Sequence, residues 1–297
     1  MKPPHSHRSG PPGAGRPPQG GPRDGRPRPP QAAPQRHQAP HHGHHAAPPR
    51  HGPPEVPRGA VWLYGLHAVA AALANPSRRL RRLLLTEEAE ASLAARLAPP
   101  WALGAERAER ARLDQMLGRD VVHQGAALLA DPLATPPLAH LLERPGTVIV
   151  LDQVGDPRNV GAILRSAAAF AAAGVITQDR NAPEETGALA KAASGALETV
   201  PLLRAVNIAR TLVALKAAGL WVVGLDGAAR APLSGPALAE RRVALVLGSE
   251  GEGLRRLTRD TCDELAAIAM PGSGGGLDSL NVAAAAAVAL YELGRRA

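Results

Sequence analysis

TVIVLDQVGDPRNVGAILRSA, residues 147–167, joins a short apolar segment to a loop and then to a helix-like segment. The almost wholly apolar segment 147–151 predicts a buried strand, and the glycine and proline after it predict a turn. Asn159 is well placed to cap a helix over 159–173. Gly161 would allow another backbone to approach this helix closely. The stretch therefore predicts a strand–loop–helix unit of an α/β fold.

The same alternation of apolar strand and helix continues towards the C-terminus. Continuous apolar strands separated by helices predict a mostly parallel sheet that is covered on both faces. Ligands of such sheets bind in the loops at the carboxyl ends of the strands, so those loops are the place to look for a site. Further strands are expected at 174–177, 199–203, 220–224, 243–247 and 265–269, and further helices at 184–194, 207–218, 252–258 and 282–293.

A smaller α/β unit of ordinary domain size precedes this sheet. Its pattern predicts a helix at 65–73, a strand at 80–86, helices at 89–97 and 105–117, and a strand at 121–123. Four prolines between residues 131 and 145 indicate a linker after it. The predicted division is a tail over 1–58, a small domain over 59–134, a linker over 135–146 and an α/β domain over 147–297.

The positive charge of the chain is concentrated in the N-terminal tail. Residues 1–58 carry nine Lys and Arg against two acidic residues, whereas the remainder carries 25 against 24 and is nearly neutral. The tail also holds 17 of the 30 prolines and no aromatic residue, a composition that predicts disorder. A basic tail suits a polyanion such as RNA, and a solvated, nonspecific arm is the plainer alternative.

Composition also excludes several classes of protein. The single cysteine, Cys262, excludes an intrachain disulfide and a cysteine-cluster metal site. The histidines at 41–45 are joined by no acidic or cysteine ligand, so we assign no metal. No apolar run is long enough for a membrane span, and the N-terminus lacks the apolar stretch of a signal peptide. We therefore expect a cytoplasmic protein that binds neither membrane nor metal.

Two charged residues stand out in the loops and helices that follow the strands. Arg165 is the only charge among Ala, Ile, Leu and Phe in the helix predicted over 159–173, so it must reach an anion or solvent. A snorkelling surface arginine is the plainer reading of such a residue. In LVLGSEGEGLRRLT, residues 245–258, Ser249 and Glu252 fit a capping box. That assignment leaves Glu250 without a structural role and makes it the better functional candidate.

The third loop, in IAMPGSGGGLDSLNVAAAAAVALYEL (residues 268–293), ends at an alanine-rich helix. Ser279 and Asn281 stand directly before that helix, where capping is the plain interpretation. Alanine at nearly every turn permits tight helix packing, so we expect this helix to be buried at a domain or subunit contact.

Together, in this order, the strings LDQVGDPRNVGAILRSA, LVLGSEGEGLRRLT and LDSLNVAAAAAVALYE resemble the three motifs of the SpoU (TrmH) family of the SPOUT methyltransferase superfamily. The resemblance covers residues 147–293, and more loosely 62–130, which resembles the family's substrate-binding domain. It implies an α/β fold with a trefoil knot near the C-terminus, with a small N-terminal α/β domain like ribosomal protein L30e. It also implies a homodimer formed through the knotted domain.

The resemblance further implies S-adenosylmethionine as cofactor and methyl transfer to a ribose 2′-hydroxyl of RNA. The cofactor should lie against Gly248, Ile268 and Leu280, with Ser279 and Asn281 nearby. The catalytic set would be Arg165, Asn159, Glu250 and Asn281. Because the arginine guanidinium stays protonated in water, two roles are open for Arg165, transient proton acceptance or a phosphate clamp. We favour positioning and electrostatics.

Within the family, the small domain resembles that of enzymes that methylate a guanosine of large-subunit (23S) ribosomal RNA, and a tRNA guanosine methyltransferase is the alternative. The arginine run at 78–82 could contact phosphates, although a solvated face is nearly as good a reading. A Rossmann dehydrogenase lacks support because no G-x-G-x-x-G is present. A noncatalytic RNA-binding or ribosome-assembly factor remains as a further class.

Overall fold

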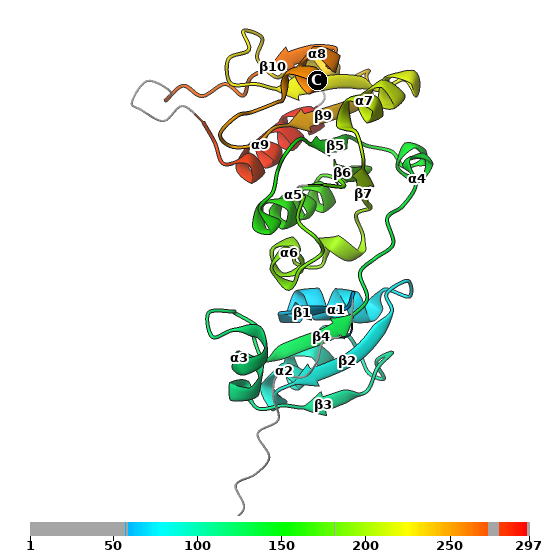
Figure 1. The fold of residues 1–297 in the computed structure, drawn as a ribbon, viewed down its shortest axis with the longest axis vertical. Helices are drawn as coiled ribbons and strands as arrows, with labels where there is room; N and C mark the ends of the chain where they lie inside the picture. The colour runs from blue at the N-terminus through cyan, green and yellow to red at the C-terminus, as the bar shows by residue number, and fades with distance from the viewer. Residues whose placement is uncertain (1–56, 58, 181, 273–278, 296–297) are drawn as a thin grey trace, which may run out of the picture. The chain divides into compact units, whose positions relative to one another are not determined.

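The computed structural model describes residues 57, 59–180, 182–272 and 279–295 (Figure 1). All of them belong to one compact unit, His51–Ala297. Within these ranges no helix is long and apolar enough to cross a membrane. The tail predicted over 1–58, with its histidines, lies outside the described residues apart from Pro57.

The predicted parallel sheet is confirmed and has six strands. Their order is β10-β8-β9-β5-β6-β7, and every neighbouring pair is parallel. Sequence order reverses between β5 and β9 at the centre of the sheet, where doubly wound folds bind their ligands. The strands are β5 Val148–Leu151, β6 Gly174–Gln178, β7 Leu202–Ala205, β8 Trp221–Leu225, β9 Val243–Leu247 and β10 Glu264–Ala266.

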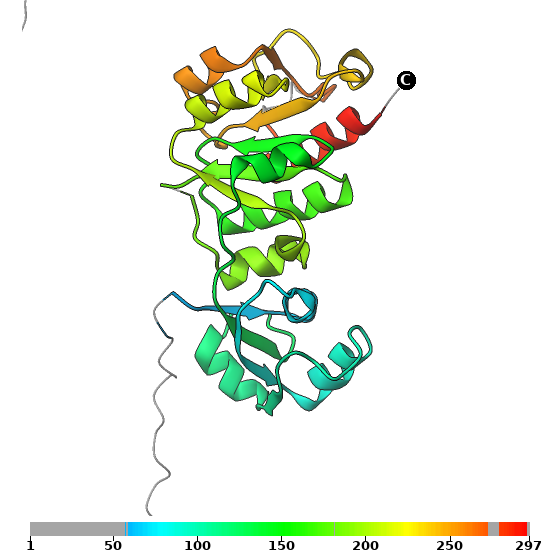
Figure 2. The same cartoon turned by 90° about the vertical axis from the view of Figure 1, so that its right-hand side faces the viewer.

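Helices cover both faces of this sheet (Figures 1 and 2). Successive residues of β5 point to opposite faces, and both sets are fully buried: Ile149 and Leu151 in one core cluster, Val148 and Val150 in the other. The first cluster includes α5 Pro157–Ala169, α6 Gly187–Ala193 and α9 Val282–Gly294, and the second includes α4 Leu138–Glu143 and α7 Ile208–Ala217, with α8 Arg256–Thr261 beside α7.

A second, four-stranded sheet is formed by the N-terminal part of the described chain. Its order is β1-β4-β2-β3, with β4 antiparallel to both neighbours and β2 parallel to β3. The elements are β1 Val61–Tyr64, α1 Leu66–Ala74, β2 Leu80–Leu85, α2 Glu87–Ala94, β3 Ala105–Arg107, α3 Arg110–Leu117 and β4 Ala126–Ala130.

Several predicted elements in this part were wrong. The helix predicted over 105–117 begins only at Arg110, because residues 105–107 pair with β2 as an edge strand. The strand predicted at 121–123 is absent, and the true strand, Ala126–Ala130, lies fully buried between two partners. The predicted linker contains α4. Alanine and leucine carry little strand preference, so only the neighbouring strands decide the state of residues 126–130.

The chain after β10 pairs with the loop that follows β8. Ala267 donates its N–H to Ala231 O at 2.9 Å and accepts from Leu233 N at 2.8 Å. Farther along the same loop, Gly235 N donates to Glu292 Oε1 of α9 at 3.2 Å. The loop after β8 thus contacts both the chain after β10 and α9. The trefoil knot stays a prediction, because residues 273–278, between these segments, lie outside the described residues.

The close approach expected at Gly161 is present between α5 and α6. A Cβ at this position would lie 2.7 Å from Ala192 Cβ and 3.0 Å from Ala193 N, and still closer to Leu189 O. Backbone atoms cannot yield as flexible side chains do. Replacement by alanine must therefore push the two helices apart.

We predict that Gly161→Ala lowers the free energy of unfolding by about 1–3 kcal/mol, the usual cost of overpacking. Denaturant unfolding followed by circular dichroism would measure this change. Gly104→Ala is the matched control because nothing lies within 4 Å of its added Cβ, and its effect should stay within about 0.5 kcal/mol. Equal stabilities of the two variants would contradict the proposed helix contact.

Candidate active site and cofactor pocket

A single carboxylate oxygen joins three loops at the carboxyl ends of the strands. Glu250 Oε1, in the loop after β9, accepts from Asn159 Nδ2 at 3.0 Å and from Asn281 Nδ2 at 2.6 Å. The N–H of Val282 adds a third, longer contact at 3.3 Å. Asn281 Nδ2 also donates to Asn159 Oδ1 at 3.1 Å. Three of the four predicted catalytic residues therefore form one hydrogen-bonded cluster.

Asn281 serves two purposes with the two ends of its amide. Its Oδ1 accepts from Ala283 N at 2.9 Å and from Ala284 N at 3.3 Å, so it caps α9 as the plain interpretation expects. Its Nδ2 donates to Glu250 and Asn159. Capping thus fixes the orientation of the amide, and the orientation presents two protons to the cluster.

Asn159 was expected to cap α5, and this expectation was wrong. The cap is Asp156, whose carboxylate accepts from Arg158 N at 2.8 Å, and Pro157 occupies the first helical position. Asn159 consequently lies inside the first turn. Its side chain is free to reach Glu250 because another residue caps the helix.

The capping box expected from Ser249 and Glu252 is also absent, since α8 begins only at Arg256. Instead, the backbones of Ser249 and Gly253 pair with each other at 3.2 and 3.0 Å and close a tight loop. Gly248 faces the returning chain, where a Cβ would collide with the backbone of Gly253 and Leu254. The glycine at 248 is therefore required by the loop itself.

Asp152, which lies in none of the predicted site positions, anchors this loop to the end of β5. Asp152 is fully buried and accepts from Arg255 N at 3.1 Å, Arg255 Nε at 2.8 Å and Gln178 Nε2 at 3.1 Å. An acidic residue directly after a buried strand was the available signal, because a buried carboxylate needs partners. The contacts fix the loop after β9 against β5.

A cavity of about 400 Å³ lies between the loops after β8, β9 and β10. This volume is in the range of small-molecule sites. Its lining includes four of the predicted cofactor residues, Gly248, Ile268, Ser279 and Leu280, whereas Asn281 does not line it. The loop residues between 225 and 228 also line it, and the sequence analysis did not identify them. The lining combines apolar side chains such as Ile268 and Leu280 with charged ones such as Asp226 and Arg259, which suits a ligand that has both an apolar ring and polar groups.

An ion pair closes one side of the cavity. Arg259 Nη2 lies 2.7 Å from Asp226 Oδ2, and both residues line the space. Asp226 also accepts from Ala228 N at 2.9 Å, which holds its loop in place. The pair therefore links the loop after β8 to α8.

Arg165 stands apart from the Glu250 cluster. It is exposed on α5, and within the described residues no hydrogen bond or ion pair is recorded for its side chain. The arginine that lies two helical turns before it, Arg158, is exposed as well. The guanidinium is therefore free to meet an anion from outside the described chain.

The sequence matches two family models and several curated relatives. Residues 146–291 match the model of the SpoU rRNA Methylase family, and residues 62–136 match that of RNA 2′-O ribose methyltransferase substrate binding. The chain is 38% identical over 251 residues to the 23S rRNA (guanosine-2′-O-)-methyltransferase RlmB of Pseudomonas putida, covering 79% of this chain and 96% of that protein. It is 40% identical over 245 residues to RlmB of Vibrio cholerae, with the same coverage.

Solved structures show the same fold. An RNA 2′-O ribose methyltransferase matches with a TM-score of 0.63 and 27% identity, covering 79% of this chain and 88% of that one. The SpoU methyltransferase AviRb of Streptomyces viridochromogenes, in complex with AdoMet, matches with a TM-score of 0.65 and 23% identity, covering 80% and 89%. By these motifs, this fold and this identity over nearly the whole length of its relatives, the chain belongs to the SpoU rRNA methylase family of SPOUT methyltransferases.

Proposed function

We propose that this protein transfers a methyl group from S-adenosylmethionine to the ribose 2′-hydroxyl of a guanosine in 23S ribosomal RNA, in the cytoplasm. The observation that carries the proposal is the Glu250 cluster beside the cavity, built from all three family motifs. The RlmB relatives, named for this reaction, match over 96% of their own length.

The cavity beside Gly248, Ile268 and Leu280 is the proposed cofactor site. Its backbone groups can bind an adenine edge, and the clash of a Cβ at Gly248 shows how closely the loop turns there. When bound, S-adenosylmethionine supplies an electrophilic methyl group on a positive sulfonium. The chain's own task is to hold the loops closed and to exclude water from the reacting centre.

The Glu250 cluster is proposed to hold the reacting ribose in line with the methyl group. Charge-assisted hydrogen bonds of a carboxylate are stronger than neutral ones, so Glu250 fixes both asparagine amides. Arg165 is assigned a positioning and electrostatic role on the RNA, either by clamping a phosphate or by assisting removal of the hydroxyl proton. Its exposed, uncommitted guanidinium supports this role.

The decisive experiment is methyl transfer from labelled cofactor to separate pools of unmodified 23S rRNA and tRNA, with nucleoside analysis of the product. We expect 2′-O-methylguanosine in the rRNA. Arg165→Ala should lower turnover by about 100-fold or more while cofactor binding and dimerisation persist. Near-normal turnover of the variant would exclude the role of Arg165. Product in tRNA alone would overturn the substrate, and cofactor binding without any transfer would favour a noncatalytic factor.

Glu250→Gln tests the cluster separately. The amide keeps the size of the side chain but removes the charge that holds both asparagines, so turnover should fall by roughly 10- to 100-fold, corresponding to one charged hydrogen bond. Glu240→Gln is the control because Glu240 is an exposed carboxylate that does not line the cavity. Steady-state kinetics with saturating RNA would measure both variants, and equal turnover would contradict the proposed role.

We also propose a homodimer that forms through the face shared by α5 and α9. Three large apolar side chains are exposed there: Phe170 at 41%, Val288 at 43% and Tyr291 at 59%. The rings of Phe170 and Tyr291 form an edge-to-face pair with centroids 6.4 Å apart. The whole chain has only one Phe and two Tyr, so two exposed aromatic rings side by side favour a protein contact.

Val288→Asp should convert the dimer to a monomer, because a carboxylate would have to be desolvated in the contact. Sedimentation velocity at micromolar concentration would measure the association state. Val206→Asp is the matched control, since Val206 is 88% exposed at the end of β7, away from α9. If Val288→Asp sediments as the unmodified protein does, another face forms the dimer.

A further inference from the structure

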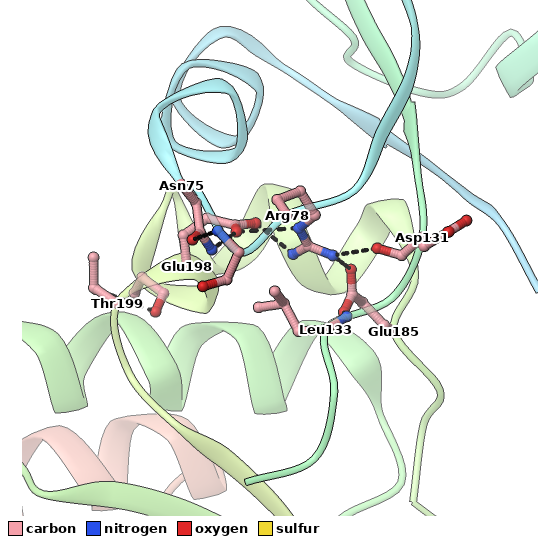
Figure 3. A network of polar contacts seen from close by, with 9 residues as sticks. Asn75, Arg78, Asp131, Leu133, Glu185, Glu198 and Thr199 are labelled. Carbon is pink, nitrogen blue, oxygen red and sulfur yellow. Dashed lines mark hydrogen bonds and ion pairs between the residues drawn. The ribbon is translucent and has the colours of Figure 1, made fainter. Parts of the chain in front are cut away.

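Arg78 is the one member of the arginine run at 78–82 whose side chain is fully buried (Figure 3). It lies in the loop between α1 and β2. Its Nε donates to Glu198 Oε2 at 3.1 Å, Nη2 pairs with the other oxygen of Glu198, and Nη1 pairs with Glu185 and donates to Asp131 O at 3.0 Å. The expectation that Arg78 contacts RNA phosphates was therefore wrong.

The two carboxylate partners of Arg78 come from the other part of the described chain. Glu185 precedes α6 and Glu198 ends the short 3₁₀ helix Ala196–Glu198, so both belong to the part that carries the active site. Glu185 Oε2 also accepts from Leu133 N at 3.0 Å, and Asn75 Nδ2 donates to Glu198 Oε2 at 2.7 Å. The small N-terminal part, residues 59–134, and the methyltransferase part thus meet at one guanidinium (Figure 3).

Among the described residues, these parts also meet through small residues and through one exposed hydrogen bond, from Lys191 Nζ of α6 to Gln124 Oε1. Gly187 of α6 lies against the ring of Tyr64, and Gly195 lies against Ala71 of α1. On the same side, a cavity of about 950 Å³ is lined by Asn75, Leu133, Glu185 and Glu198 among others. Small apolar surfaces allow close approach but give little directional preference. The buried directional constraint comes from the arginine group, because the Lys191–Gln124 bond is exposed to solvent.

The charges do not balance within this group. One guanidinium faces two carboxylates, and burial raises the pKa of Glu185 above its ordinary value against the opposing effect of Arg78. Buried ion pairs contribute little net stability compared with apolar packing, but removing one partner leaves an uncompensated charge. Such a group is better suited to specifying one arrangement than to stabilising the fold.

We propose that Arg78 is a positioning residue that fixes the angle between the substrate-binding part, residues 59–134, and the methyltransferase part, so that RNA held by the first presents its ribose to the second. This inference rests on the proposed function. A displacement of about 1 Å in the reacting geometry lowers the rate roughly 100-fold. Variation in the angle between the two parts would displace the ribose from the cofactor and so lower the methylation rate.

Arg82 provides a matched control. It forms an equally bidentate pair with Glu106, at 2.8 and 2.7 Å, but both residues belong to the small part. Arg78→Met and Arg82→Met each remove one bidentate arginine and leave an apolar side chain of similar length. Only the first removes a contact between the parts.

The first readout is the distance between two spin labels on the full-length protein, at Glu88→Cys in α2 and Val213→Cys in α7, both exposed positions. Cys262 is partly buried and its pKa is raised to about 11 by burial, so it should react little with the label. We expect the distance distribution to broaden in Arg78→Met and to stay narrow in Arg82→Met. An unchanged distribution in Arg78→Met would overturn the proposal.

The second readout separates positioning from general structural damage. Arg78→Met should lower kcat/KM for rRNA by roughly 100-fold and leave the Kd of S-adenosylmethionine within about twofold, with Arg78→Lys in between. Parallel loss of cofactor binding and RNA turnover would overturn the positioning role. If Arg78→Met does not fold, Glu185→Gln, which keeps the pair with Glu198, replaces it.

Failure of the proposed function is distinguishable from failure of this inference. The spin-label measurement needs no turnover. If the unmodified protein shows no methyltransferase activity but the distance distribution still broadens in Arg78→Met, the positioning role of Arg78 is supported and the proposed function is contradicted. If the unmodified protein and Arg78→Met both methylate rRNA normally and give identical distance distributions, only the positioning role of Arg78 is contradicted.

Discussion

The candidate site is organised around one oxygen atom. Glu250 Oε1 receives hydrogen bonds from both asparagine amides and from the first N–H of α9, and these donors come from segments 91 and 31 residues away. The loop after β9 is closed by the backbone pair of Ser249 and Gly253 and is held to β5 by Asp152, so it presents Glu250 to the other two motifs. The contacts of Glu250 then fix how Asn159 and Asn281 lie relative to this loop.

The sheet makes this convergence possible before any side chain acts. β5 and β9 are adjacent at the centre of a parallel sheet, so the loops that follow them begin side by side. Asp152 then joins the end of β5 to Arg255 across those loops. The local sequence determines which hydrogen-bonding side chains each loop carries, and the strand order determines which loops lie next to each other. This order explains why strings 90 residues apart behave as one site.

Sequence alone predicted the parallel sheet because its strands are continuously apolar and its helices are periodic. It also identified Asn159, Glu250 and Asn281, through motifs that the structure brings together. It failed where the deciding contact is distant in sequence. Ala126–Ala130 is a strand only because two neighbours pair with it, and Asn159 is not a cap only because Asp156 is. In the sequence Arg78 cannot be distinguished from the neighbouring arginines, because the carboxylates that bury and pair with it, Glu185 and Glu198, lie far away along the chain.

The role of each arginine therefore depends on which residues it pairs with in the fold, and not on its neighbours in the sequence. Arg81 and Arg82 form close pairs with Asp131 and Glu106, whereas Arg79 is 81% exposed and lies 3.6 Å from the same Asp131. Near His67 of α1, the described residues provide no carboxylate partner for Arg96, Lys191 or Arg165, and the pKa of His67 is lowered by burial and then by these three cations. Because the chain beyond the tail is nearly neutral overall, attraction of RNA must be local. Arg96, Lys191 and Arg165 form one such local group of positive charge beside His67.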